Sequence, residues 1–78
     1  MLDIKRIKAE RIAKGYTQDY MAEQMGYKDR APYAKRENGI VNIGADELYK
    51  IAKILEIDDM RIFFKLNVPD RERKEEVN

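Results

Sequence analysis

The side chains best suited to chemistry lie in the stretch RAPYAKRENG, residues 30–39. At helical spacing this stretch presents two opposite faces, one with Tyr33, Arg36 and Glu37 and the other with Arg30, Ala31, Ala34 and Lys35. An arginine can donate two hydrogen bonds to O6 and N7 of guanine, and a lysine can bond the same atoms. The small alanines let a helix backbone approach a groove, and either methyl can touch a thymine methyl. Arg30 and Lys35 are equally compatible with phosphate contact or plain solvation.

The composition argues against catalysis. The chain has no cysteine, histidine or serine, which removes the commonest general base, the commonest metal ligands and the commonest hydroxyl nucleophile. We therefore expect no enzyme activity, no metal, no cofactor and no small-molecule ligand. The net charge of +1 lacks the strong basic excess that marks many nucleic-acid-binding proteins, although residues 1–40 are more basic than the remainder. No apolar run approaches membrane-spanning length, and the chain is expected to be cytoplasmic.

The elements that carry these residues are predicted to be short helices. The first spans about Leu2 to Lys14 and ends at a left-handed Gly15. Thr17 is a good N-cap for a second helix, Gln18–Met25, and Gly26 supplies the turn that follows.

Pro32 determines where the third helix begins. A proline is tolerated in the first turn, where the N–H groups have no intrahelical partner, and it is costly further in. The helix is therefore predicted to have Asp29 as its N-cap, to begin at Arg30, and to end near Asn38-Gly39.

The remainder completes an all-α, compact five-helix bundle. A fourth helix is predicted over Ala45–Leu55 with Gly44 as its N-cap, and a brief last helix, capped by Asp58 or Asp59, holds Met60, Phe63 and Phe64. Residues 1–68 form one domain in this scheme. Residues 69–78 are too polar to offset their ordering entropy and are expected to be a flexible tail.

Helix, glycine turn and second helix in close succession form a helix-turn-helix arrangement. The residues that make the pattern more specific are Arg11, Gly15-Tyr16-Thr17-Gln18, Ala22, Gly26-Tyr27, Tyr33, Lys35 and Glu37-Asn38-Gly39. Together they resemble the lambda-repressor-like, or Cro/C1-type (XRE), family of DNA-binding domains over about residues 4–64. The resemblance implies a five-helix bundle, a homodimer on a palindromic double-stranded DNA operator, and transcription regulation, often repression.

Contacts to the DNA backbone are expected from five residues. The N-terminus of the second helix, with Thr17, should point at a DNA phosphate, and its backbone N–H groups and the Gln18 amide are the donors. Lys28, in the turn before the third helix, can reach a phosphate, and Asn38 and Asn42 match family positions near the DNA backbone. Five others are expected to be structural, with Arg11 and Glu37 as the buried ion pair that the resemblance implies, Ala22 at the helix crossing, Gly26 in the turn and Tyr33 in the core. For Thr17, capping alone is an open alternative.

Two positions depart from the family pattern. Relatives often have lysines after the Glu-Asn-Gly segment, where this chain has Ile40-Val41, so the salt dependence of binding is expected to be modest. Arg36 occupies a position that is usually apolar in relatives. It is expected to extend along the core edge or to meet an acidic neighbour.

Dimerisation is expected near the last helix, through Ile62, Phe63, Phe64, Leu66 and Val68. The alternative is that Phe63 and Phe64 both cap the core internally. A second function also fits the same bundle, namely an antitoxin or adaptor that binds another protein. Such a protein should expose an apolar patch on its third helix, whereas the predicted face of Arg, Ala, Ala and Lys favours nucleic acid.

Overall fold

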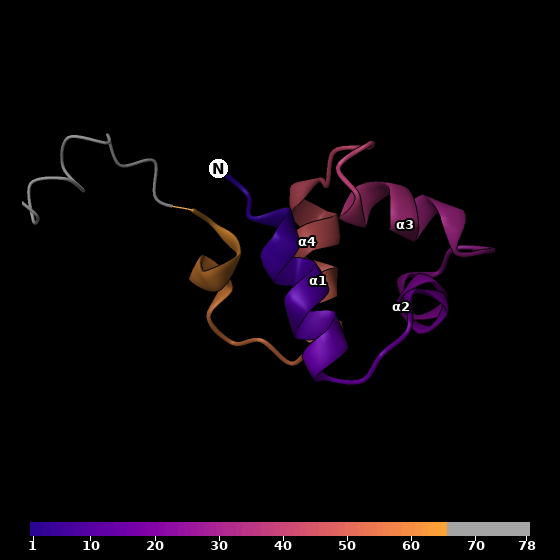
Figure 1. The fold of residues 1–78 in the computed structure, drawn as a ribbon, viewed down its shortest axis with the longest axis horizontal. Helices are drawn as coiled ribbons and strands as arrows, with labels where there is room; N and C mark the ends of the chain where they lie inside the picture. The colour runs from indigo at the N-terminus through magenta and orange to yellow at the C-terminus, as the bar shows by residue number, and fades with distance from the viewer. Residues whose placement is uncertain (66–78) are drawn as a thin grey trace, which may run out of the picture.

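The structure is a computed structural model that describes residues 1–65, and the main elements of this part of the chain are helices joined by short connections. The element order is α1 (Ile4–Ala13), α2 (Gln18–Met25), α3 (Ala31–Glu37), α4 (Ala45–Ile54) and a 3-10 turn, η1 (Met60–Phe63). Figure 1 shows α2 end-on with α3 lying across it, and it shows η1 at the opposite end of the molecule from α3. No helix in the described part of the chain has the length and apolarity needed to cross a membrane.

The first two helices begin and end where local signals place them. Thr17 Oγ1 accepts a hydrogen bond from the Tyr20 N–H at 2.9 Å, which confirms the cap of α2. Gly26 follows with φ +88°, a left-handed conformation that an L side chain adopts only with strain, so the turn depends on glycine here. The predicted bounds of α2 are confirmed. Helix α1 begins later than predicted because Asp3 is its N-cap.

Helix α3 starts one residue later than predicted. Arg30 is the N-cap, and the Asp29 carboxylate accepts a hydrogen bond from the Ala31 N–H at 3.1 Å. Pro32 therefore lies within the first turn, where its missing N–H costs no intrahelical bond. Helix α4 has Gly44 as its N-cap, as predicted, and the Glu47 carboxylate accepts from the Gly44 N–H at 2.9 Å. It ends at Ile54 rather than Leu55.

The fifth helix of the predicted bundle is a single 3-10 turn, so the described residues hold four α-helices. The chain becomes extended at Phe64, which pairs with Leu2 in an isolated antiparallel bridge. The Asp3 N–H donates to the Phe63 carbonyl at 2.6 Å, and the Lys65 N–H donates to the Met1 carbonyl at 2.7 Å. Leu2 was expected inside the first helix, but this pairing holds it in an extended conformation.

The core is built from side chains of every helix: Ile7, Met21, Ala22, Met25, Tyr33, Leu48, Ile51, Ala52, Leu55 and Phe63. Ala22, only 2% exposed, lies buried where α2 meets its neighbours, as expected of a small residue at a crossing. Phe63 and Phe64 differ in burial. Phe63 is fully buried and Phe64 is 49% exposed, because η1 turns the first side chain inward and the extended backbone turns the second outward.

This burial corrects the predicted dimer surface. Phe63 cannot contact a partner, since its side chain has no accessible surface. Ile62 is partly buried against the core, and Phe64 stays available. The predicted dimer residues Leu66 and Val68 and the predicted tail lie outside the described residues.

Candidate nucleic-acid interface

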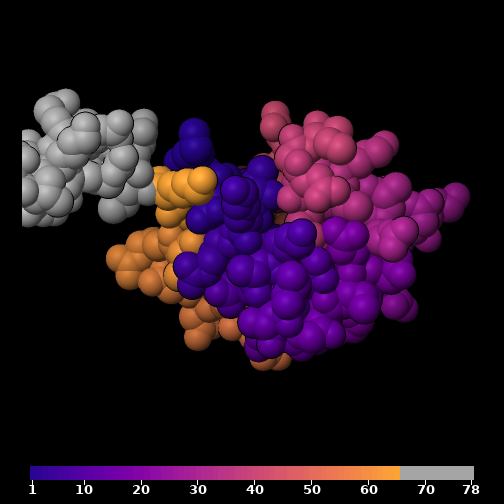
Figure 2. Space-filling model, viewed as in Figure 1, coloured from indigo at the N-terminus to yellow at the C-terminus, as the bar shows by residue number. Residues whose placement is uncertain are grey.

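The two faces of α3 are divided as the helical spacing predicts. Tyr33 and Glu37 are buried, with 0% and 4% of their surface exposed. On the opposite side Arg30, Ala31 and Lys35 are exposed, and Ala34 is half-buried. Figure 2 shows α3 and its following loop forming one edge of the molecule. The recognition face, defined as Arg30, Ala31, Ala34 and Lys35, is therefore open to a ligand.

A shallow, open hollow lies along the recognition face. Its lining is formed by Asp19, Asp29, Arg30, Ala31, Ala34, Lys35 and Asn38. Of the other predicted contact residues, Lys28 lines an adjoining hollow beside the turn. Thr17 and Asn42 are exposed, and Gln18 is half-buried; none of these three lines the hollow.

Two acidic side chains in the hollow were not predicted as site residues. Asp19 comes from the first turn of α2 and Asp29 from the turn before α3. In the sequence Asp19 is notable only as an acidic residue favourable to the α2 dipole, and the approach of α2 to α3 brings it to the recognition face. Among residues 1–65 no group of acidic side chains is arranged to hold a metal ion.

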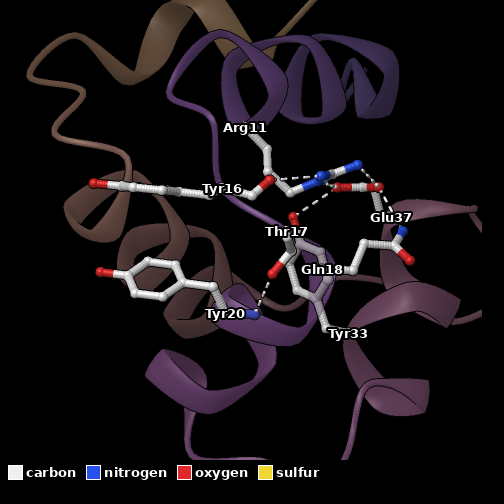
Figure 3. A network of polar contacts seen from close by, with 7 residues as sticks. All are labelled: Arg11, Tyr16, Thr17, Gln18, Tyr20, Tyr33 and Glu37. Carbon is white, nitrogen blue, oxygen red and sulfur yellow. Dashed lines mark hydrogen bonds and ion pairs between the residues drawn. The ribbon is translucent and has the colours of Figure 1, made fainter.

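Below the recognition face, the Glu37 carboxylate is the centre of a buried polar network (Figure 3). Arg11 donates to it twice, from Nε at 2.8 Å and from Nη2 at 3.2 Å. The Tyr33 hydroxyl donates at 2.8 Å, and Gln18 Nε2 donates at 2.7 Å. Arg11 Nη1 also donates to the Tyr16 carbonyl at 2.8 Å. One carboxylate therefore joins α1, α2 and α3.

The network changes the role of Gln18. Its amide was predicted to donate to a DNA phosphate, but in the structure one amide N–H is directed to Glu37. A primary amide has two donor hydrogens, so the second is still available for a phosphate. Gln18 therefore links the start of α2 to the buried network.

The network also determines how its members titrate. Burial alone would raise the pKa of Glu37, but the hydrogen bonds from Arg11, Tyr33 and Gln18 outweigh burial and hold that pKa below its ordinary value. Burial, and then the bond to Glu37, raises the pKa of the Tyr33 hydroxyl. The carboxylate thus remains charged and the phenol protonated at neutral pH, which is the combination that the hydrogen bonds require.

A second polar cluster lies next to the first along α3. Arg36 Nη2 is 3.0 Å from Glu47 Oε2, and Arg36 Nη1 donates to the Pro32 carbonyl at 2.8 Å. The guanidinium carbon lies 5.2 Å from the centre of the Tyr27 ring, which is in cation–π range. Arg36 therefore both extends along the core edge and meets an acidic neighbour. Tyr27 is half-buried at the margin of the core.

The buried ion pair should carry much of the stability. Replacing Arg11 with alanine leaves the Glu37 charge buried without its main partner, and we expect the free energy of unfolding to fall by about 3–5 kcal/mol. Urea denaturation followed by circular dichroism measures this. The control is Lys14→Ala, which removes a solvent-exposed ion pair with Glu56 and should change stability little. Equal losses in the two variants would contradict the central role of the network.

The depressed pKa of Glu37 predicts acid sensitivity. A carboxyl group that titrates lower in the folded state contributes its full stability above its unfolded pKa, near 4.5, and loses it as the pH falls through the folded pKa. Wild-type stability should therefore decline below about pH 4.5. The Glu37→Gln variant should be less stable at pH 7 and should decline less steeply, as measured by urea unfolding at each pH. Parallel pH profiles for the two proteins would show that Glu37 is not a source of the decline.

Comparison with known proteins places this geometry in a family. The family described as Helix-turn-helix matches residues 7–59, which include α2, α3, α4, most of α1 and the recognition face. No curated protein and no solved structure matches the chain. The matched region contains the Arg11–Glu37 pair, the Gly26 turn and the exposed face of α3. The chain therefore belongs to the Cro/C1-type (XRE) helix-turn-helix family of DNA-binding transcription regulators.

Proposed function

We propose that this protein is a sequence-specific transcription regulator of the repressor type, which binds a palindromic duplex DNA operator as a homodimer with α3 in the major groove. The observation that supports this most strongly is the recognition face. Basic and small side chains are exposed there, while the tyrosine side of the same helix is buried.

Base contacts come from the recognition face. Arg30, at the N-cap of α3, donates two hydrogen bonds to a guanine, and Lys35 reaches a neighbouring base edge. Ala31 and Ala34 have small side chains, so the α3 backbone can enter the groove. Exposed basic side chains on this face favour a nucleic-acid ligand. An antitoxin or adaptor would be expected to expose apolar side chains here for its protein partner.

Backbone contacts surround the base contacts. The N-terminus of α2, with Thr17 and the second amide hydrogen of Gln18, meets a phosphate. Lys28 in the turn, Asn38 at the end of α3 and Asn42 in the next loop contact the sugar-phosphate backbone. All five are polar side chains with hydrogen-bond donors, and four of the five are exposed.

The electrostatic part of this binding is modest. Asp19 and Asp29 lie beside Arg30 and Lys35 in the same hollow, so negative charge offsets part of the positive charge. The exposed Ile40 stands where relatives carry a phosphate-neutralising lysine. Fewer neutralised phosphates mean fewer released counterions, and hence a shallow dependence of affinity on salt.

The homodimer forms through the end of the molecule that carries η1. Phe64 is exposed there, and Ile62 lies partly exposed next to it. Because η1 lies away from α3 in Figure 1, contact between two copies at this end leaves both recognition faces free for successive half-sites.

Selection of bound duplexes from a random pool tests the function. The wild-type protein should enrich a palindromic consensus, and an unenriched pool would exclude sequence-specific binding. Arg30→Ala should cost about 1–3 kcal/mol on that consensus and relax base preference at one position in each half-site. Lys53→Ala, which removes an exposed positive charge from α4, outside the recognition face and outside the proposed dimer interface, is the matched control and should leave binding unchanged. If Arg30→Ala weakened binding to all sequences alike, Arg30 would be a backbone contact.

Sedimentation across micromolar concentrations tests the homodimer. Phe64→Ser should shift the wild-type dimer towards monomer, because it removes the main exposed apolar side chain of the proposed interface. Tyr49→Ser is the control, since Tyr49 is an exposed aromatic residue on α4 of similar accessibility, 57% against 49%. A wild-type protein that stayed monomeric throughout, or an equal effect of both substitutions, would contradict this interface.

A further inference from the structure

Arg36 makes three contacts with different parts of the helix-turn-helix unit. Its guanidinium meets Glu47 near the start of α4, lies against the Tyr27 ring in the turn between α2 and α3, and donates to the Pro32 carbonyl in the first turn of α3. The Tyr27 hydroxyl lies 3.4 Å from the same Glu47 carboxylate. We call Arg36, Glu47 and Tyr27 the α4 anchor.

The α4 anchor is poorly suited to be a source of stability. The Arg36 Nε atom is buried and has no hydrogen-bond partner, and the side chain as a whole is 19% exposed. An unpaired buried donor is unfavourable, and a partly desolvated ion pair often adds little net stability over apolar side chains of similar size. An apolar residue at position 36 would remove both costs. The contacts of Arg36 therefore point to a role in orientation.

The geometry of α3 shows what this anchor can orient. Adjacent residues of a helix point about 100° apart around its axis. Glu37 is held by Arg11 of α1, and its neighbour Arg36 is held by Glu47 of α4. The burial of Tyr33 and Glu37 decides which side of α3 faces inward, and a second attachment in a different direction restricts the smaller rotation that remains. That rotation sets the directions of Arg30 and Lys35.

We propose that Arg36 is a positioning residue for DNA recognition: by joining α3 and the turn to Glu47, it fixes the rotation of α3 and so determines which bases Arg30 and Lys35 reach. This inference rests on the proposed function. It assigns sequence discrimination to a residue that lies behind the recognition face and contacts no DNA itself.

The Arg36→Met variant separates orientation from stability. Methionine keeps the length and apolar stem of arginine and removes the anchor. The melting temperature should stay within a few degrees of wild type. The ratio of affinities for the selected operator and a scrambled duplex should fall about tenfold, since misdirected side chains lose base discrimination. Lys53→Met is the matched control, because Lys53 lies over Tyr49 at 5.5 Å and likewise loses one charge and one cation–π contact. Its affinity ratio should be unchanged.

Amide hydrogen exchange gives a readout that needs no DNA. In Arg36→Met the amides of Tyr27 and Ala34, which donate to the carbonyls of Ala22 and Arg30, should exchange faster, while those of α1 stay as in the wild type. Glu47→Gln, whose side-chain oxygen can still accept from the Gly44 N–H, should give the same pattern, and the double variant should add little.

An unchanged affinity ratio, or a loss that matches a fall in melting temperature, would overturn the inference. So would unchanged exchange at the amides of Tyr27 and Ala34. If the wild-type protein binds no duplex, the proposed function fails, and the exchange measurement still decides whether Arg36 fixes α3.

Discussion

The structure depends on keeping one buried negative charge fully paired. Glu37 is almost inaccessible, and a carboxylate in that position is tolerated only when nearly every lone pair is satisfied. Arg11 from α1, Gln18 from α2 and Tyr33 from α3 satisfy it. Since Tyr33 and Glu37 lie one turn apart on α3, both must face inward. The same helical geometry turns Arg30, Ala31, Ala34 and Lys35 outward, so the buried network determines which side of α3 a ligand can meet.

Much of this could be predicted from the sequence because the signals are local. Thr17 and Gly26 fix the ends of α2, and Pro32 restricts the start of α3 to within a residue. The spacing of Tyr33 and Glu37 then separates the two faces without any knowledge of the tertiary structure. The ion pair between residues 11 and 37 is distant in sequence, and it was predicted only because the chain resembles a family in which that pair occurs.

The features that sequence could not supply are those that depend on contacts between elements. Nothing local distinguishes Phe63 from Phe64; the 3-10 turn and the bridge from Leu2 decide which one is buried. Asp19 looks like an ordinary first-turn acid until the packing of α2 against α3 brings it to the recognition face. Arg36 was ambiguous for the same reason, because its partner Glu47 belongs to the next helix.

The hollow along the recognition face contains both acidic and basic side chains, and this mixture affects how much of the proposed binding energy comes from phosphate contacts and how much from base contacts. A surface rich only in lysine and arginine binds any duplex, because every sequence presents the same phosphates. Asp19 and Asp29 lower the attraction to phosphate for all sequences equally, while the proposed hydrogen bonds of Arg30 to a matching base are kept. The free energy of binding then falls by the same amount for every sequence, so base contacts supply a larger share of the binding free energy at the preferred site. Such a protein depends on accurate placement of a few side chains, and therefore on the two attachments that hold α3 from α1 and from α4.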